Sequence, residues 1–549
     1  MVRALLISFP GYPYTPSSLL PDNGLANLAG ALIEAGHEAL ILDYGTIDAM
    51  KRLIPQDVRP KLCRVYDGLR AAMSGRFSRL RGLRSLLRLR VLDRHLARHR
   101  NNEFLCIAEE LAGAIRKGRF DLVGFKLWNG DGFDGPIAMA EHLKRQFPNL
   151  KVFAGGPHVD FFRGLIFERT RAFDALVFGE GEETILEIAD FVSGKRKLDF
   201  YNLITPDGAE RETKRVENLD SLPMPVYEES IYPAIRGDQK IKIVVLDESR
   251  GCPYACAFCV QPVKSGHHRR LKSAARVVAE MRHVRDRYGI RTFRYAGSST
   301  PAKLMREVAE KIIEQGLDVN YCSYGHFREF APDDAPLLKR SGMFGILFGI
   351  ESGSQKVLDL MNKRTTVEQI RTGVKAAKNA GIFVVGSVIL PAPGDTEETM
   401  RETFDLLTDV RPDSVFIQFA GLYPRTPWAN DPKRYGFDVN SETYCRQVMN
   451  YKIKTLFPPS FWSPLPYKVN GLRFRQFARI TERFALKLER AGLVTQLTDD
   501  IAMIGSVLGV DPQEFKELTA RAMWTGDWEK MAEVAATFNE RTKWTRQKT

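Results

Sequence analysis

Three cysteines with close, uneven spacing are the residues in this chain most able to do chemistry. Cys252, Cys256 and Cys259 form a C-x3-C-x2-C segment directly after an apolar run at 241–247, and no other cysteine lies nearby in the sequence. Iron–sulfur clusters are normally held by four thiolates. A site one ligand short leaves an open position, which a catalytic metal needs. The spacing therefore predicts a [4Fe–4S] cluster with one open iron.

A structural zinc site is the alternative interpretation of the same cysteines. Structural zinc is four-coordinate, so it would need a fourth ligand such as His267 or His268. The chain has seven cysteines in 549 residues, and three of them lie within eight positions. This is the spacing of a metal site rather than of a disulfide framework, and it predicts a cytoplasmic protein in a reducing compartment.

The elements that must position the cysteines form a strand–helix series from 241 to 429. Strands joined by helices predict a parallel sheet, and six strands are two short of a full (β/α)8 barrel. We therefore expect a partial (β/α)6 barrel. Its expected strands are 241–247, 292–296, 318–323, 344–350, 382–389 and 414–420.

The first 195 residues also alternate strand and helix, which predicts a Rossmann-like, doubly wound α/β domain. Ligands of such domains bind beyond the carboxyl ends of the strands, where the glycines of this segment fall. A proline-rich linker follows at 196–240, and 430–549 is predicted to be a mostly helical domain that closes the barrel mouth. The expected strands of the first domain are 2–9, 38–43, 121–127, 151–154 and 173–178.

A basic insertion at about 46–100 interrupts the first domain, and it supplies much of the net charge of +13. Between Arg76 and Arg100 there are nine arginines and one acid. A nucleic-acid or anionic-lipid partner would suit this stretch. We favour an arginine-coated helical pair whose leucines, Leu87 and Leu92 among them, pack inward, because no RNA-binding motif or aromatic interleaving accompanies the charge. No run of about 18 apolar residues occurs, so no membrane span is predicted.

At this point the chain resembles a known family. The C-x3-C-x2-C segment at the end of the first barrel strand is similar to the signature of the radical S-adenosylmethionine (SAM) superfamily, and segments 296–298, 349–353, 390–396 and 422–427 resemble its later strand-end motifs. The resemblance implies that the open iron binds SAM and that one electron breaks a carbon–sulfur bond to give a 5′-deoxyadenosyl radical. The SAM-binding residues it implies are Phe258, Ala296, Gly297, Ser298, Glu351, Ser352, Leu390, Gln418 and Tyr423.

The domain ahead of the barrel resembles the cobalamin-binding, or class B, branch of that superfamily. A nucleotide-binding or purely scaffolding domain is the alternative, but the first loop lacks G-x-G-x-x-G. That loop, 10–14, also has no histidine, so the cobalt is expected to lack a histidine ligand below; His158 is a weak candidate. The cobalamin-binding residues implied are Tyr12, Lys126, Trp128, Gly155, Gly156, Pro157, His158, Gly179, Glu180 and Gly181.

The resemblance implies a cobalamin-dependent radical SAM C-methyltransferase. Such an enzyme transfers a methyl group from SAM via methylcobalamin to a carbon of a small molecule, for example an amino acid or natural-product precursor. Two alternatives keep the cofactors: a rearrangement or cyclisation without methylation, and polar methyl transfer without a substrate radical. A cobalamin- or iron-sensing regulator that binds nucleic acid is a further alternative, though a sensor needs no SAM site. We expect a monomer that takes electrons from a flavodoxin or ferredoxin.

Overall fold

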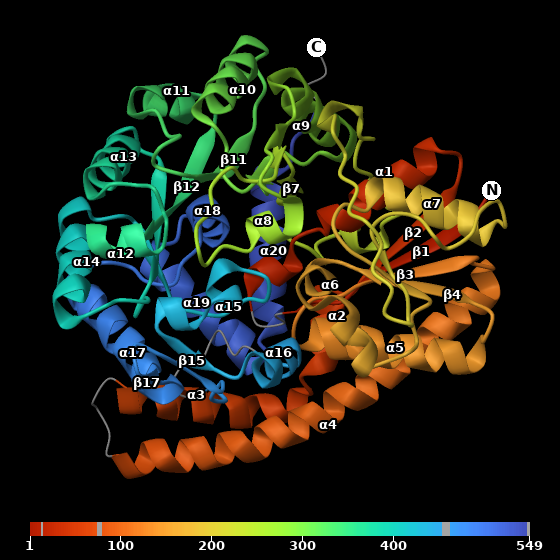
Figure 1. Cartoon of the computed structure of the whole chain (residues 1–549), viewed down its shortest axis with the longest axis horizontal. Coiled ribbons are helices and arrows are strands. Elements are labelled where there is room, and N and C mark those ends of the chain that lie inside the picture. Colours follow the sequence, from red (N-terminus) through yellow and green to blue (C-terminus); the bar gives the residue numbers. More distant parts are fainter. Residues whose placement is uncertain (12–14, 74–78, 453–461, 546–549) are drawn as a thin grey trace.

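The computed structural model describes residues 1–11, 15–73, 79–452 and 462–545 (Figure 1). Its first sheet has the strand order β2-β1-β3-β4-β5-β6. The first five strands run parallel, as predicted, whereas β6 pairs antiparallel with β5. The sequence analysis missed β6 because it is two residues long. The strands are β1 (Arg3–Ser8), β2 (Glu38–Asp43), β3 (Leu122–Lys126), β4 (Lys151–Gly155), β5 (Ala175–Val177) and β6 (Leu203–Ile204).

Helices cover both faces of this sheet, which is why the middle of β1, Ala4–Ile7, is continuously apolar. Successive side chains of a strand point to opposite faces. Ala4 and Leu6 join one core cluster with the helices of one face, and Leu5 and Ile7 join a second cluster with the helices of the other. All four are at most 1% exposed. The covering helices are α1 (Asn23–Glu34) and α7 (Glu182–Val192) on one face, and α4 (Arg79–Gly118) and α5 (Asp131–Gln146) on the other.

The basic insertion is helical, as expected. After α2 (Ile47–Leu53), α3 (Arg59–Met73) and α4 pack side by side and form the elongated hairpin at the bottom of Figure 1. One expectation about its packing is wrong: Leu87 is 54% exposed, because it lies on the outer face of α4. Leu92 is half-buried against the core.

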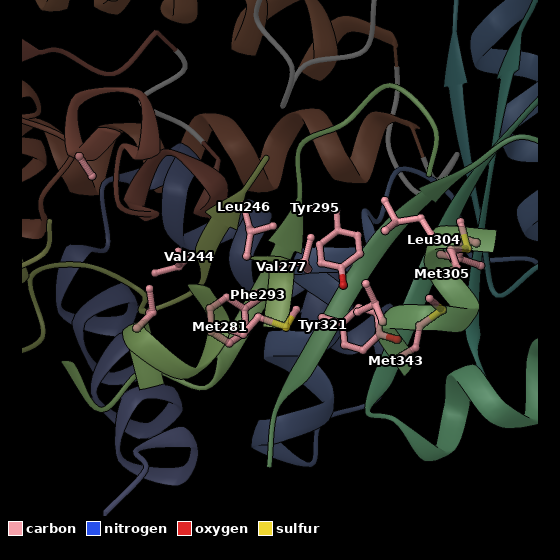
Figure 2. Packing of buried hydrophobic residues seen from close by; sticks show 14 of the residues in the cluster. Val244, Leu246, Val277, Met281, Phe293, Tyr295, Leu304, Met305, Tyr321 and Met343 are labelled. Carbon is pink, nitrogen blue, oxygen red and sulfur yellow. The ribbon is translucent and has the colours of Figure 1, made fainter. Parts of the chain in front are cut away.

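The second sheet confirms the partial barrel. Its order is β14-β13-β12-β11-β10-β7, with every pairing parallel. Figure 2 shows Val244, Leu246, Phe293 and Tyr295 of the strands meeting apolar side chains of α9 (Ala274–Tyr288) and α10 (Ala302–Glu314). The strands are β7 (Val244–Leu246), β10 (Thr292–Tyr295), β11 (Asn320–Gly325), β12 (Met343–Glu351), β13 (Phe383–Ile389) and β14 (Ser414–Gln418).

The C-terminal part is mostly helical but also contains a small antiparallel sheet, β15-β16-β17. Its helix α18 packs against β12 and β13. The carboxylate of Asp499, at the start of α18, also pairs with Arg294 of β10 at 2.9 Å. No described helix is long and apolar enough to cross a membrane. The elements are β15 (Phe437–Val439), α16 (Ser441–Met449), β16 (Tyr467–Val469), β17 (Leu472–Arg473), α17 (Phe474–Arg490), α18 (Asp499–Leu508), α19 (Pro512–Thr525) and α20 (Trp528–Thr542).

Candidate cluster and cofactor site

The cysteine loop begins at a short hairpin of β8 (Ser249–Arg250) and β9 (Arg270–Leu271). Gly251 has φ +81°, and a Cβ there would lie 2.1 Å from the His268 carbonyl oxygen, so only glycine suits the turn. The Cys252 amide donates to the Gly266 carbonyl at 3.0 Å. These contacts hold the backbone of the first cysteine against the hairpin before any cofactor binds.

The three cysteine thiols lie in a largely buried environment. Cys252 and Cys256 are 8% and 7% exposed, and burial raises the pKa of the Cys259 thiol to about 12. A cube that takes each thiolate on a different iron needs its sulfur atoms spread apart, and its cationic irons would offset the cost of deprotonating buried thiols.

Lys363 is a site residue that the sequence analysis missed. Its ammonium lies 3.0 Å from Glu351 Oε1, and both side chains are buried. The charge of Lys363 lowers the pKa of the Cys256 thiol against the effect of burial. Lys363 lies in a loop after α12 (Gln355–Leu360) without a recognisable motif, so the sequence held no signal for it beyond a lysine near Glu351.

The predicted turn at Ala296, Gly297 and Ser298 follows β10 and is held from below by Glu248. This glutamate is fully buried, and the Gly297 amide donates to its Oε2 at 2.9 Å. A Cβ on Gly297 would lie 1.9 Å from Glu248 Oε1. Ser298 Oγ donates to the Gly251 carbonyl at 2.8 Å, so the turn is tied to the cysteine loop. Sequence reasoning missed Glu248, whose role depends on this long-range contact.

The other predicted SAM residues lie at the carboxyl ends of neighbouring strands. The Leu390 amide donates to the Gln418 carbonyl at 2.6 Å, which joins the ends of β13 and β14. Ser352 Oγ lies 3.2 Å from Oγ1 of Thr403, a residue of helix α14 (Glu397–Val410). Tyr423 is 39% exposed, and Phe258 of the cysteine loop contacts Trp428 of the same post-β14 segment. The topology thus brings the strand-end segments to one edge of the barrel.

A buried ionic seam joins this edge to the first domain. The Arg250 guanidinium contacts Glu182 Oε1 at 2.5 Å and Asp247 Oδ2 at 3.1 Å. The Arg270 guanidinium binds both oxygens of Glu180, at 2.5 and 2.9 Å. Buried charges are tolerated when they are paired and hydrogen-bonded, as they are here. The carboxyl-end loop after β5 therefore faces the loop that carries the cluster cysteines.

The cobalamin residues predicted at the first sheet meet different partners. Lys126, at the end of β3, lies 2.7 Å from Asp22 Oδ2. The Trp128 ring packs against Gly11, and a Cβ added to Gly11 would lie 1.8 Å from that ring. At Gly156, which precedes Pro157 with φ +97°, a Cβ would lie 3.0 Å from the Leu127 carbonyl oxygen. The glycine is therefore needed for chain packing, whatever ligand binds. Tyr12 lies outside the described residues.

His158 is buried, whereas the segment 179–181 runs from the exposed Gly179 through the buried Glu180 to the half-buried Gly181. His158 is 3% exposed, and its Nε2 hydrogen-bonds the Met449 carbonyl at 2.8 Å, so burial lowers its pKa to about 4. The Gly179 amide donates to Asp160 Oδ1, and the Glu180 carboxylate binds Arg270 in the ionic seam. A Cβ on Gly181 would lie 3.0 Å from the Leu28 side chain. Gly155, at the end of β4, lies against Val177 of β5. The roles predicted for these residues in binding cobalamin stay predictions.

Known proteins match both halves of this arrangement. Residues 249–407 match the Radical SAM superfamily, and residues 87–189 match the B12 binding domain. An uncharacterized methyltransferase of Pyrococcus horikoshii is 29% identical over 324 residues, which cover 58% of this chain and 70% of that protein. The anaerobic magnesium-protoporphyrin IX monomethyl ester cyclase of Rubrivivax gelatinosus is 26% identical over 51% of this chain and 52% of that protein. The chain thus spans about half the length of the cyclase.

A solved structure shares the whole fold. The radical SAM methyltransferase TsrM from Kitasatospora setae, with cobalamin and a [4Fe–4S] cluster bound, matches with a TM-score of 0.63 at 16% identity, over 97% of this chain and 100% of that chain. A B12-binding domain followed by a radical SAM barrel defines a radical SAM enzyme that uses cobalamin. The chain therefore combines a B12-binding domain with a radical SAM domain, and the cofactors of these two domains are a [4Fe–4S] cluster, SAM and cobalamin.

Proposed function

We propose that the chain is a C-methyltransferase that moves a methyl group from SAM, by way of cobalamin, to a carbon of a small-molecule precursor. The observation that carries the proposal is the seam of Arg250, Glu182, Glu180 and Arg270, which turns the carboxyl edges of the two sheets toward each other. Bound there, the cluster and cobalamin would supply radical generation and methyl carriage to one chamber.

The chain's own residues would bind, orient and exclude water. Cys252, Cys256 and Cys259 would each hold one iron, and the buried Lys363 ammonium would offset the added negative charge. Glu248 fixes the 296–298 turn through the Gly297 amide, which keeps its outward-facing groups in place for a polar ligand. Pre-positioning of this kind lowers the entropic cost of bringing reacting groups together.

Product analysis tests the proposal. Anaerobically reconstituted protein with methyl-deuterated SAM should transfer the label to an amino acid or natural-product precursor. S-adenosylhomocysteine and 5′-deoxyadenosine should then form in step with the product, as measured by mass spectrometry. The C252A variant is the matched control, because it loses a thiolate of the expected cluster while the cobalamin domain is unchanged, so it should form neither 5′-deoxyadenosine nor labelled product. Labelled product without 5′-deoxyadenosine would contradict the radical mechanism and indicate polar transfer.

A second candidate function is radical cyclisation or rearrangement without methyl transfer. The match to the magnesium-protoporphyrin ester cyclase favours it, because that relative is named for ring closure rather than for methylation. Under this alternative, 5′-deoxyadenosine would form in step with a cyclised, unlabelled product and S-adenosylhomocysteine would be absent. The same experiment therefore separates the two candidates.

A further inference from the structure

The cysteine loop reaches the surface of the barrel between its first two cysteines. Pro253 is exposed and Tyr254 and Ala255 are half-buried, while Cys252 and Cys256 on either side are buried. The chain therefore comes to the surface between two of the expected cluster ligands. Electron transfer falls off steeply with distance, so this is the face at which an external donor would approach closest.

An aromatic stack begins at this segment. The rings of Tyr254 and His326 are parallel, with an interplanar angle of 3° and centroids 4.0 Å apart. His326 Nε2 hydrogen-bonds the Lys363 carbonyl at 3.3 Å. Burial and nearby cations lower the pKa of His326 to about 3, so its ring is neutral. Packed rings thus connect the surface to the segment that carries Lys363.

Positive charge surrounds the exposed segment. Arg328 and Arg364 are exposed, and neither forms an ion pair with any residue that the structure describes. The Arg328 amide donates to Nδ1 of His326, the ring that stacks on Tyr254, at 3.3 Å. Arg364 Nε donates to Asn362 Oδ1 at 3.3 Å, and Asn362 Nδ2 donates to the Ala255 carbonyl at 2.8 Å. Both arginines are therefore attached to the neighbourhood of the loop.

The acids nearby do not cancel this charge. Glu329 is occupied by Arg269, whose guanidinium binds both of its oxygens at 2.7 and 2.8 Å. Arg364 also keeps φ +53°, a region that disfavours side chains, and such backbone strain is concentrated at functional sites. The net result is two guanidinium groups, without ion pairs among the described residues, beside a small, partly apolar segment, a combination that suits a protein interface.

We propose that this cluster-loop face, formed by Pro253, Tyr254, Ala255, Arg328 and Arg364, docks an acidic one-electron donor protein of the flavodoxin type. The proposal rests on the proposed function, which requires a reduced cluster. In the step, an anionic flavin hydroquinone loses one electron and becomes the neutral semiquinone. The oxidised cluster gains that electron, and no proton needs to move between the two proteins.

The arginine-rich face of α4 is a second surface whose positive charge alone would suit an acidic donor protein. Arg84, Arg88, Arg94 and Arg98 are exposed there without ion pairs among the described residues. However, α4 packs on α3 and α5 rather than on the cysteine loop, so a donor seated there would be separated from the cluster by the first domain. This face therefore supplies a control with the same change of charge at a remote place.

The test compares R328E/R364E with R88E/R94E in the cluster-loaded full chain, with flavodoxin as the probe. Calorimetry gives the flavodoxin Kd at low and high salt, and stopped-flow absorbance gives the rate of semiquinone formation. We expect R328E/R364E to weaken binding and slow reduction roughly tenfold or more at low salt, since rim charges control association. R88E/R94E should behave as the unmodified protein does.

Two further readouts keep the outcome decisive. Dithionite should reduce the cluster equally in all proteins, which shows that the cluster is intact, and R328Q/R364Q should give an intermediate rate. Equal flavodoxin binding by R328E/R364E, or a loss confined to R88E/R94E, would overturn the proposal. Failure of the proposed function would instead appear as missing product with dithionite, while the salt-dependent flavodoxin binding persisted.

Discussion

The Arg250 guanidinium contacts Glu182 of the first domain at 2.5 Å, two residues before the first cluster cysteine. The cluster loop and the cobalamin domain are therefore connected by a charge pair whose side chains are 10% and 8% exposed. The first prediction concerns this pair. Replacing Arg250 by Met leaves buried carboxylates without their cation, which should lower the free energy of unfolding by about 3–5 kcal/mol, as measured by urea denaturation of the apoprotein.

The surface pair of Arg236 and Glu229 provides the control for this experiment, because its side chains are 74% and 52% exposed. Arg236→Met should change the free energy of unfolding by only about 0–1 kcal/mol. Equal effects of the two substitutions would show that the seam does not hold the domains together.

Lys363→Met should leave a cluster that forms but is harder to reduce. The substitution removes a buried cation beside Cys256 and leaves Glu351 uncompensated, and both changes favour the more oxidised cluster. An EPR-monitored titration should give a more negative midpoint potential, with a loss of stability of about 3–5 kcal/mol. Lys356→Met, on the exposed side of α12, is the control. A potential equal to that of the unmodified protein would contradict this role for Lys363.

Gly297→Ala should impair SAM binding because the added Cβ would lie 1.9 Å from Glu248 Oε1 and 2.2 Å from Ser249 Oγ. Both neighbours are buried, so the turn must shift, at a cost of about 1–3 kcal/mol. Equilibrium dialysis of SAM against the cluster-loaded protein measures the effect. Gly113→Ala, in α4 with no atom within 4 Å of its Cβ, should bind SAM normally. Normal binding by both variants would remove the turn from the SAM site.

His158 should make the protein less stable in acid. Its pKa is lowered from 6.5 to about 4 because the neutral ring is buried, whereas the unfolded chain binds a proton near pH 6.5. The stability that His158 contributes should therefore be lost as the pH decreases from 6.5 to about 4, by about 3 kcal/mol at most, and this contribution should not change further below that range.

His158→Gln tests this pH dependence, since a glutamine amide can still donate to the Met449 carbonyl but does not titrate. Its stability should lose the pH dependence that His158 contributes over that range, which a comparison with the unmodified protein measures. Cobalamin absorbance spectra of the variant answer a second question. An unchanged spectrum is expected from a ring already bonded to Met449; a shifted one would make His158 the lower ligand after all.

Local sequence patterns were enough to predict most of the strands of both sheets. Alternating apolar strands and helices predicted five parallel strands and the six barrel strands, because burial between helices demands continuous apolar runs such as Ala4–Ile7. Strand β6 and the sheet of β15, β16 and β17 were missed because strands of two or three residues leave no period to detect. The outward position of Leu87 also escaped prediction, since composition does not say which face of a helix finds a partner.

The sequence by itself predicted the cluster ligands, because Cys252, Cys256 and Cys259 are close enough along the chain to be recognised by spacing alone. Only the tertiary structure decided their surroundings. Glu180 was predicted to bind cobalamin, yet its carboxylate is held by Arg270, 90 positions away. Lys363 and Glu248 became site residues through similar long-range pairing. Buried charges are paired by the packing of segments that are distant in the sequence, and such pairs produce no periodic pattern from which they could be predicted.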